Sequence, residues 1–137
     1  MYQTQVLIIG SGIGGCSAAI HLARAGIKVI IVTPAKDINE SSTWHAQGGI
    51  VTLGEDDSTE LLFDDIVRAG DGLCNPEAVQ ILSEWGPRYV EDFLIKDIGV
   101  PFTPANHGKP GFDITMEAAH SRRRILHVVD ATGKAIE

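Results

Sequence analysis

The sequence has 137 residues, which is enough chain for one domain with a single core. Its composition, 44% apolar and 21% charged, is that of a globular protein, and no run reaches the ~18 apolar residues of a membrane span. The formal net charge of −7 argues against a nucleic-acid partner, because contacts to phosphates need clustered Lys and Arg.

The first third of the chain predicts a β-turn-α-β unit. Residues 5–9 contain an unbroken apolar run, typical of a strand buried on both faces. A glycine-rich turn at 10–15 leads into an Ala-rich helix at 16–25, which ends at Gly26. Residues 28–32 form a second buried strand, parallel to the first because a helix joins them. We therefore expect an α/β fold, a parallel sheet with helices.

Further helices are predicted downstream. Residues 57–60 offer a cap and an acid in the first turn of one helix, and Asn75-Pro76 opens another. We expect Gly86-Pro87 to break that second helix, and Trp85 and Tyr89 to lie in the core. Residues 130–137 read as the start of a helix, so we expect this sequence to be the front end of a longer polypeptide.

The glycine turn carries the first functional signal. Gly10, Gly12 and Gly15 satisfy GxGxxG directly after a buried strand and directly before a helix, the context of a dinucleotide site. Gly10 permits the tight turn, Gly12 lets backbone approach a pyrophosphate, and Gly15 lets helix and strand pack closely. The free N–H groups of the helix N-terminus then face the phosphates. The acid that commonly holds an adenosine ribose is replaced by Thr33, which favours a flavin over NAD.

A second signal is the polar stretch at residues 41–49. A plain surface loop explains its hydroxyl and amide side chains but not its paired glycines, Gly48 and Gly49. Placed a few residues after the second strand, the stretch can run beside a dinucleotide. Its polar groups can then bond the pyrophosphate and the flavin edge, and its glycines let backbone amides approach the ring.

Three segments together resemble one family. The turn at 10–15, the S-T-W-H-A-Q-G-G run at 42–49 and the D-A-T-G run at 130–133 are similar to the flavoproteins of the succinate dehydrogenase, fumarate reductase and L-aspartate oxidase superfamily. The resemblance implies that residues 1–137 are the N-terminal part of a Rossmann-like FAD-binding domain, without the capping and C-terminal helical domains. The cofactor-binding residues that it implies are Gly10, Ser11, Gly12, Ile13, Gly14, Gly15, Thr33, Ser42, Thr43, Trp44, His45, Ala46, Gln47, Gly48 and Gly49.

Two positions discriminate within this superfamily. The respiratory enzymes carry a histidine that links FAD covalently where this sequence has Ser42, so the resemblance implies non-covalent FAD. The run from Met116 to His127 resembles the E-G-G-H-S-x-R-R-I-L-H segment of L-aspartate oxidases, with Ala118-Ala119 in place of the glycines. Glu117 in that run can pair with the α-ammonium of aspartate, whose charge is costly to bury without an anion.

The activity implied by this resemblance is FAD-dependent oxidation of L-aspartate to iminoaspartate in de novo NAD biosynthesis. Oxygen or fumarate is the electron acceptor, and quinolinate synthase is the implied pathway partner. Other catalytic groups of the family lie beyond residue 137, so we expect no turnover from this chain alone. The alternatives are a soluble fumarate reductase or succinate dehydrogenase flavoprotein, and a truncated FAD-binding module without catalysis.

Several side chains keep more than one interpretation. Arg122-Arg123-Arg124 is either a solvated basic face or a source of one arginine that neutralises a dicarboxylate or a phosphate. His120 and His127 are either structural hydrogen-bonding groups or catalytic. No His/Cys/Asp cluster has metal-ligand spacing. Cys16 and Cys74 form no CxxC pair, which fits a reducing compartment, and we expect a cytoplasmic protein.

Overall fold

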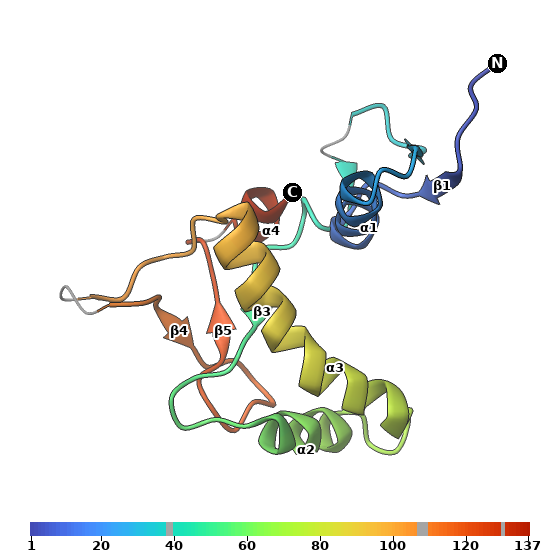
Figure 1. Ribbon diagram of the computed structural model, residues 1–137. Coiled ribbons are helices and arrows are strands. Elements are labelled where there is room, and N and C mark those ends of the chain that lie inside the picture. The colour runs from blue at the N-terminus through green and yellow to red at the C-terminus, as the bar shows by residue number, and fades with distance from the viewer. Residues whose placement is uncertain (38–39, 107–109, 130) are drawn as a thin grey trace. The chain divides into compact units, whose positions relative to one another are not determined.

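A computed structural model describes residues 1–37, 40–106, 110–129 and 131–137 (Figure 1). The chain divides into two compact units. Unit 1 comprises Met1–Gln47 together with Gly133–Glu137, and unit 2 comprises Gly48–Thr132.

Unit 1 holds the parallel sheet that the sequence predicts. Strand β1 (Val6–Ile9) pairs in parallel with β2 (Val29–Val32), with Val6 opposite Val29, and helix α1 (Ile13–Arg24) connects them. Helix α1 packs against both strands (Figure 1). A short helix, α4 (Thr132–Ile136), begins in the D-x-T-G segment as expected, whereas Asp130 of that segment lies outside the described residues. The α/β fold with a parallel sheet is confirmed.

The prediction that both strands are buried on both faces is wrong for the described chain. In β1 the side chains of Leu7 and Ile9 are 56% and 81% exposed, and in β2 Ile31 and Val32 are also exposed. The reason is that a parallel sheet needs a layer of helices on each face. Helix α1 covers one face, and on the other face Leu7 and Ile9 stay in contact with solvent.

The helices of unit 2 begin where the sequence places their caps. Helix α2 (Thr59–Ala69) has Ser58 as its N-cap, whose Oγ accepts a hydrogen bond from the Leu61 N–H at 3.2 Å. Helix α3 (Pro76–Tyr89) is capped by Asn75, whose Oδ1 accepts from two first-turn N–H groups. Each cap satisfies donors that have no partner within the helix.

The prediction that Gly86-Pro87 breaks the second of these helices is wrong. Helix α3 runs through both residues and continues into a π-helix, η2 (Val90–Ile98), so that Figure 1 shows one continuous helix. Pro87 has no N–H to donate to the carbonyl of Ser83, and the Val90 N–H donates to the carbonyls of both Gly86 and Pro87. Burial of Val79, Ser83 and Pro87 on one face offsets the ~3 kcal/mol that a helical proline costs.

The prediction that Trp85 and Tyr89 lie in the core is also wrong. Their side chains are 60% and 44% exposed, and Ile81 and Leu82 on the same helix are exposed too. Helix α3 turns its other face towards α2, so periodicity alone does not say which apolar stripe of a helix is covered.

Unit 2 also contains a small antiparallel sheet that the sequence analysis did not predict. Its strand order is β3 (Ile50–Val51), β5 (Ile125–Leu126) and β4 (Ile114–Thr115). Strands of two residues are too short to show the alternation by which strands are recognised. The sheet has a structural consequence, because it fixes the backbone of Arg124: its N–H donates to the Thr115 carbonyl and its carbonyl accepts from the Thr52 N–H.

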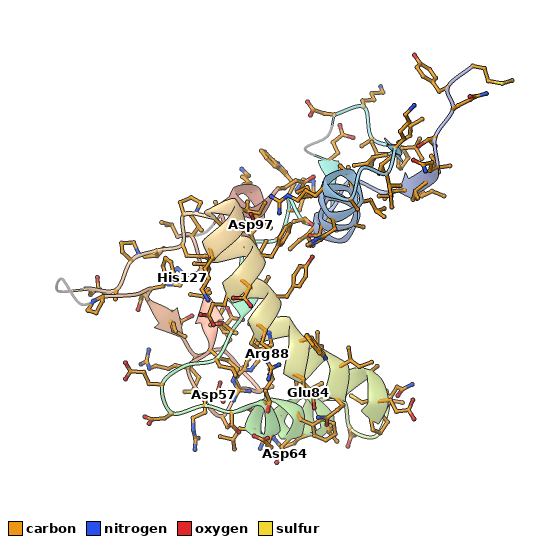
Figure 2. All side chains as sticks on the ribbon, in the orientation of Figure 1. Asp57, Asp64, Glu84, Arg88, Asp97 and His127 are labelled. Atoms are coloured by element: carbon orange, nitrogen blue, oxygen red, sulfur yellow. The ribbon has the colours of Figure 1, made fainter. Side chains whose placement is uncertain are left out.

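Arg124 is the largest fully buried side chain of the described residues. Its Nε and Nη2 bind both carboxylate oxygens of Asp57, at 2.8 and 2.7 Å, and its Nη1 lies 3.0 Å from Asp65 Oδ2. Figure 2 shows Asp57 before α2 and Asp64 on the outer side of that helix. Strand β5, helix α2 and the loop before α2 are thereby joined by one guanidinium group.

This arrangement predicts a large effect of Arg124→Ala on the stability of unit 2. Removing the guanidinium leaves the buried Asp57 carboxylate without its cation and Asp65 paired with Arg68 alone, which costs about 3–5 kcal/mol. Native-state hydrogen exchange of the α2 amides measures the loss. The control is Arg123→Ala, which removes an exposed neighbour. It should change the free energy of opening of the α2 amides by less than ~0.5 kcal/mol. Equal effects of the two substitutions would contradict a structural role for Arg124.

Candidate functional site

The glycine turn after β1 has the geometry that a dinucleotide site requires. Gly10 has φ +109°, a conformation that side chains disfavour, and its N–H donates to the Val32 carbonyl at 2.8 Å. A Cβ at Gly15 would overlap the carbonyl oxygen of Gly10 and press on Ile8. These contacts agree with the predicted roles of the two glycines. Gly10 permits the tight turn, and Gly15 lets the helix pack closely on the strand.

The N-terminus of α1 leaves polar groups for a ligand. The N-cap Gly12 has no side chain to satisfy the helix, and first-turn N–H groups have no carbonyl partner within a helix. One of them, on Ile13, donates to Thr43 Oγ1 at 3.0 Å. Ser11 Oγ is buried and has no hydrogen-bond partner within the part of the chain that the structure describes. A phosphate oxygen would satisfy both kinds of donor, so these residues fit a pyrophosphate.

Cys16 in the same helix is a hydrogen-bonded, partly buried thiol. Its Sγ donates to the Ser11 carbonyl at 3.0 Å. Burial, followed by the negative charge of Glu137, raises the pKa of the Cys16 thiol. Because the thiolate is the nucleophilic form, a raised pKa makes Cys16 an unreactive thiol.

Thr33 lies directly after β2, at the carboxyl end of the parallel pair. Its Oγ1 accepts a hydrogen bond from the Ala35 N–H at 3.3 Å, so the hydroxyl proton remains available to an acceptor. Gly10, which bonds the last residue of β2, ends the neighbouring strand at the same edge. This edge is where open parallel sheets bind ligands.

The stretch at 41–47 forms a turn that meets the glycine turn through Thr43. A Cβ at Gly12 would lie 3.0 Å from Thr43 Oγ1. The Ala46 N–H closes the turn by donating to the Thr43 carbonyl at 3.0 Å. Trp44 is half-buried, and the Lys134 ammonium lies over its ring, 5.4 Å from the ring centre. The side chains of Ser42, His45 and Gln47 are exposed.

Gly133 holds this turn from the other side. Its N–H donates to the Ala46 carbonyl at 2.9 Å, and a Cβ at this position would overlap the Thr43 carbonyl oxygen. Ser41 Oγ also bonds the Glu137 carboxylate in the same region. The glycine of the D-x-T-G segment is therefore required by backbone contact with the 43–46 turn.

The remaining predicted residues, Gly48, Gly49 and Glu117, lie in unit 2. A Cβ at Gly49 would overlap the Leu126 carbonyl oxygen and the Ile125 side chain, so strand pairing by itself requires a glycine there. A Cβ at Gly48 would meet only Glu117 Oε1, at 3.6 Å. The exposed carboxylate of Glu117 is thus brought beside the glycine pair, far away in sequence.

The loop that carries Glu117 contains a strained residue. Ala119 has φ +68°, in the left-handed region where the similar oxidase segment has glycine. The His120 N–H donates to the Glu117 carbonyl at 3.3 Å, which closes the loop. His120 Nδ1 is buried without a hydrogen-bond partner in the described ranges.

The arginine run and His127 can now be interpreted. Arg122 and Arg123 are exposed, and Arg124 is a structural cation, so neither interpretation from the sequence accounts for all three. His127 lies 3.3 Å from Asp113 Oδ2 through Nε2 and 3.5 Å from Thr103 Oγ1 through Nδ1. These contacts are those of a structural hydrogen-bonding group.

Two functional residues that the sequence did not single out, Asp65 and Ser121, hold the loop of Glu117. Asp65 Oδ2 accepts from the Ser121 N–H at 2.7 Å and from Ser121 Oγ at 2.8 Å. Burial alone would raise the pKa of Asp65, but the Ser121 hydrogen bonds and the charges of Arg124 and Arg68 together lower it. The spacing of Asp65 could have indicated its burial, because it lies three residues after Leu62 on the same face of α2.

Among the described residues, no group of three or more His, Cys, Asp or Glu side chains could hold a metal ion. No helix in that part of the chain combines the length and the apolar character needed to cross a membrane.

Comparison with known proteins agrees with this geometry. Residues 5–137 match the FAD binding domain family. Proteins named L-aspartate oxidase are similar over nearly the whole chain: that of Halobacterium salinarum is 49% identical over 133 residues, and that of Yersinia pestis is 44% identical over 138 residues. These alignments cover 97% and 98% of this chain but 25% of each relative, so the chain spans about a quarter of the relatives' length.

Solved structures show the same fold. The Sdh1 complex of Mycobacterium smegmatis with UQ1 has a TM-score of 0.86 at 27% identity, covering 98% of this chain and 22% of that one. The quinol fumarate reductase of E. coli has a TM-score of 0.86 at 26% identity, covering 98% and 23%. With the family match over 5–137 and a glycine turn that fits a pyrophosphate, the chain belongs to the FAD binding domain family, and its cofactor is FAD.

Proposed function

We propose that the complete protein is an L-aspartate oxidase and that residues 1–137 are the N-terminal part of its FAD-binding domain. It converts L-aspartate to iminoaspartate, and oxygen or fumarate accepts the two electrons and two protons. The observation that carries this proposal is Glu117, whose carboxylate lies beside Gly48 in a segment similar to that of L-aspartate oxidases. In this proposal the protein works in the cytoplasm, and quinolinate synthase consumes its product in NAD biosynthesis.

The residues of unit 1 are the ones that would hold the cofactor. Ser11 Oγ and the first-turn N–H groups of α1 bind its pyrophosphate, and Thr33 binds its ribose. Residues 42–47 of unit 1 supply the remaining polar contacts. When bound, FAD supplies a two-electron acceptor for the hydrogen on Cα of the substrate.

Glu117 selects the substrate in this proposal. Aspartate differs from succinate by its α-ammonium, which needs an anion when it leaves water. A carboxylate at 117 supplies that anion and adds a charge-assisted hydrogen bond. The second candidate, a fumarate reductase or succinate dehydrogenase flavoprotein, is favoured by the similarity to solved structures of those enzymes. Ser42 and Glu117 argue against it. A module that binds FAD without catalysis is the third candidate.

The first expected outcome is that FAD is bound without a covalent link, because Ser42 stands where the linking histidine would be. When the complete protein is precipitated with acid, the yellow flavin should remain in the supernatant. Flavin that precipitates with the polypeptide would contradict the proposal.

The second expected outcome concerns Gly12→Val. The branched side chain would enter the space where backbone approaches the pyrophosphate, and it would also displace Thr43 Oγ1, 3.0 Å from the new Cβ. Flavin occupancy of the complete protein, measured from its absorbance spectrum, should collapse while the circular dichroism spectrum is retained. Gly86→Ala, on α3, is the control, since its Cβ meets only Leu82 at 3.6 Å. Full occupancy in Gly12→Val would show that this turn is not the cofactor site.

The third expected outcome concerns Glu117→Gln, which keeps the size of the side chain and removes its charge. Loss of a charge-assisted hydrogen bond to a buried cation costs roughly 2–3 kcal/mol, or about 30- to 150-fold in kcat/KM for L-aspartate. Fumarate reduction and flavin binding should change little, because neither fumarate nor FAD presents that ammonium. Equal losses with L-aspartate and with fumarate would mean that Glu117 supports the structure of the site and does not recognise the amino group.

A further inference from the structure

We propose that Asp65 and Ser121 are positioning residues for Glu117, which rests on the proposed role of Glu117 in substrate recognition. Neither side chain needs to touch the substrate. Together they fix the one loop that brings the Glu117 carboxylate beside Gly48.

Asp65 makes several bonds to this loop. Its Oδ2 receives the Ser121 N–H and the Ser121 hydroxyl, at 2.7 and 2.8 Å. Arg68, which pairs with Asp65 Oδ1, also reaches the Ala119 carbonyl at 3.4 Å. One buried carboxylate on α2 therefore binds the end of the loop both directly and through a second side chain.

Asp65 is itself held in place by a buried ion cluster. Its side chain is 3% exposed, and the fully buried Arg124 lies 3.0 Å from its Oδ2. Arg124 in turn is bound through two nitrogens to Asp57. Because the anchor is a charged network sealed from solvent, the Ser121 hydrogen bonds act from a fixed point on α2.

The loop of Glu117 needs an anchor. The left-handed Ala119 is strained, so the loop has a tendency to relax unless its ends are held. One end is closed by the His120 N–H on the Glu117 carbonyl, a long contact of 3.3 Å, and the other end is Ser121. Releasing Ser121 would let the strained turn relax and move the Glu117 carboxylate away from Gly48.

The test compares Ser121→Ala with Ser58→Ala in the complete, FAD-loaded protein. Each substitution removes one side-chain hydrogen bond at α2 in unit 2, but the hydroxyl of Ser58 bonds the Leu61 N–H and does not reach the loop. Hydrogen exchange of the 117–121 amides is measured alongside kcat and KM for L-aspartate and for fumarate. Ser121→Thr, which keeps a hydroxyl, is the conservative variant.

We expect exchange of the 117–121 amides to rise about tenfold in Ser121→Ala and to stay unchanged in Ser58→Ala. The KM for L-aspartate should rise about tenfold with kcat little changed, because the lost interaction is uniform binding, and Ser121→Thr should restore it. Kinetics with fumarate should not change. In the double variant Glu117→Gln/Ser121→Ala, the loss with L-aspartate should not exceed that of Glu117→Gln alone.

Unchanged exchange in Ser121→Ala, or equal effects of Ser121→Ala and Ser58→Ala, would overturn the positioning role. A rise in KM shared by L-aspartate and fumarate would do the same where Glu117→Gln is selective for L-aspartate. If Glu117→Gln is not selective, the recognition role of Glu117 fails. The exchange of the 117–121 amides then decides by itself whether Asp65 and Ser121 hold the loop.

Discussion

The buried ion cluster of Arg124 with Asp57 and Asp65 is the constraint on which unit 2 depends. Removing three charged groups from water is expensive, and such a cluster stabilises a fold only when its hydrogen bonds are well formed. Here the guanidinium binds one carboxylate with two nitrogens, and the second carboxylate also receives Ser121. The cluster ties α2 to the central strand of a sheet whose strands have two residues each, too few to be stable alone.

Unit 1 is constrained by backbone contact instead of charge. Gly15 against Gly10, and Gly133 against Thr43 and Ala46, are contacts that any side chain would prevent. Through these contacts the backbones of the glycine turn, the 43–46 turn and the start of α4 lie close together, with no side chains between them at these points. Peptide groups are thereby left at the surface of that region, which is the kind of surface that a phosphate needs.

Features that are encoded by a few adjacent residues could be predicted from the sequence, and features that depend on distant residues could not. The glycine turn, the parallel pair and the caps Ser58 and Asn75 are written in a few adjacent residues, and all are found in the structure. Arg124 could not be separated from Arg122 and Arg123 by sequence, because its burial depends on the Asp57 and Asp65 carboxylates, which are far away along the chain. Continuation of α3 through Pro87 depends on what that helix face packs against, which is not a local property.

Ala119 shows how the two kinds of constraint meet. A left-handed residue is best served by glycine, which the similar oxidase segment carries at this place, and an alanine there costs about 1 kcal/mol. The cost is tolerable because Ser121 is held by Asp65 at two points. An alanine also has fewer backbone conformations open to it than a glycine, so the loop of Glu117 is stiffer once it is anchored. The strain at Ala119 and the attachment of the loop to α2 therefore act together. The position of the Glu117 carboxylate beside Gly48 depends on both.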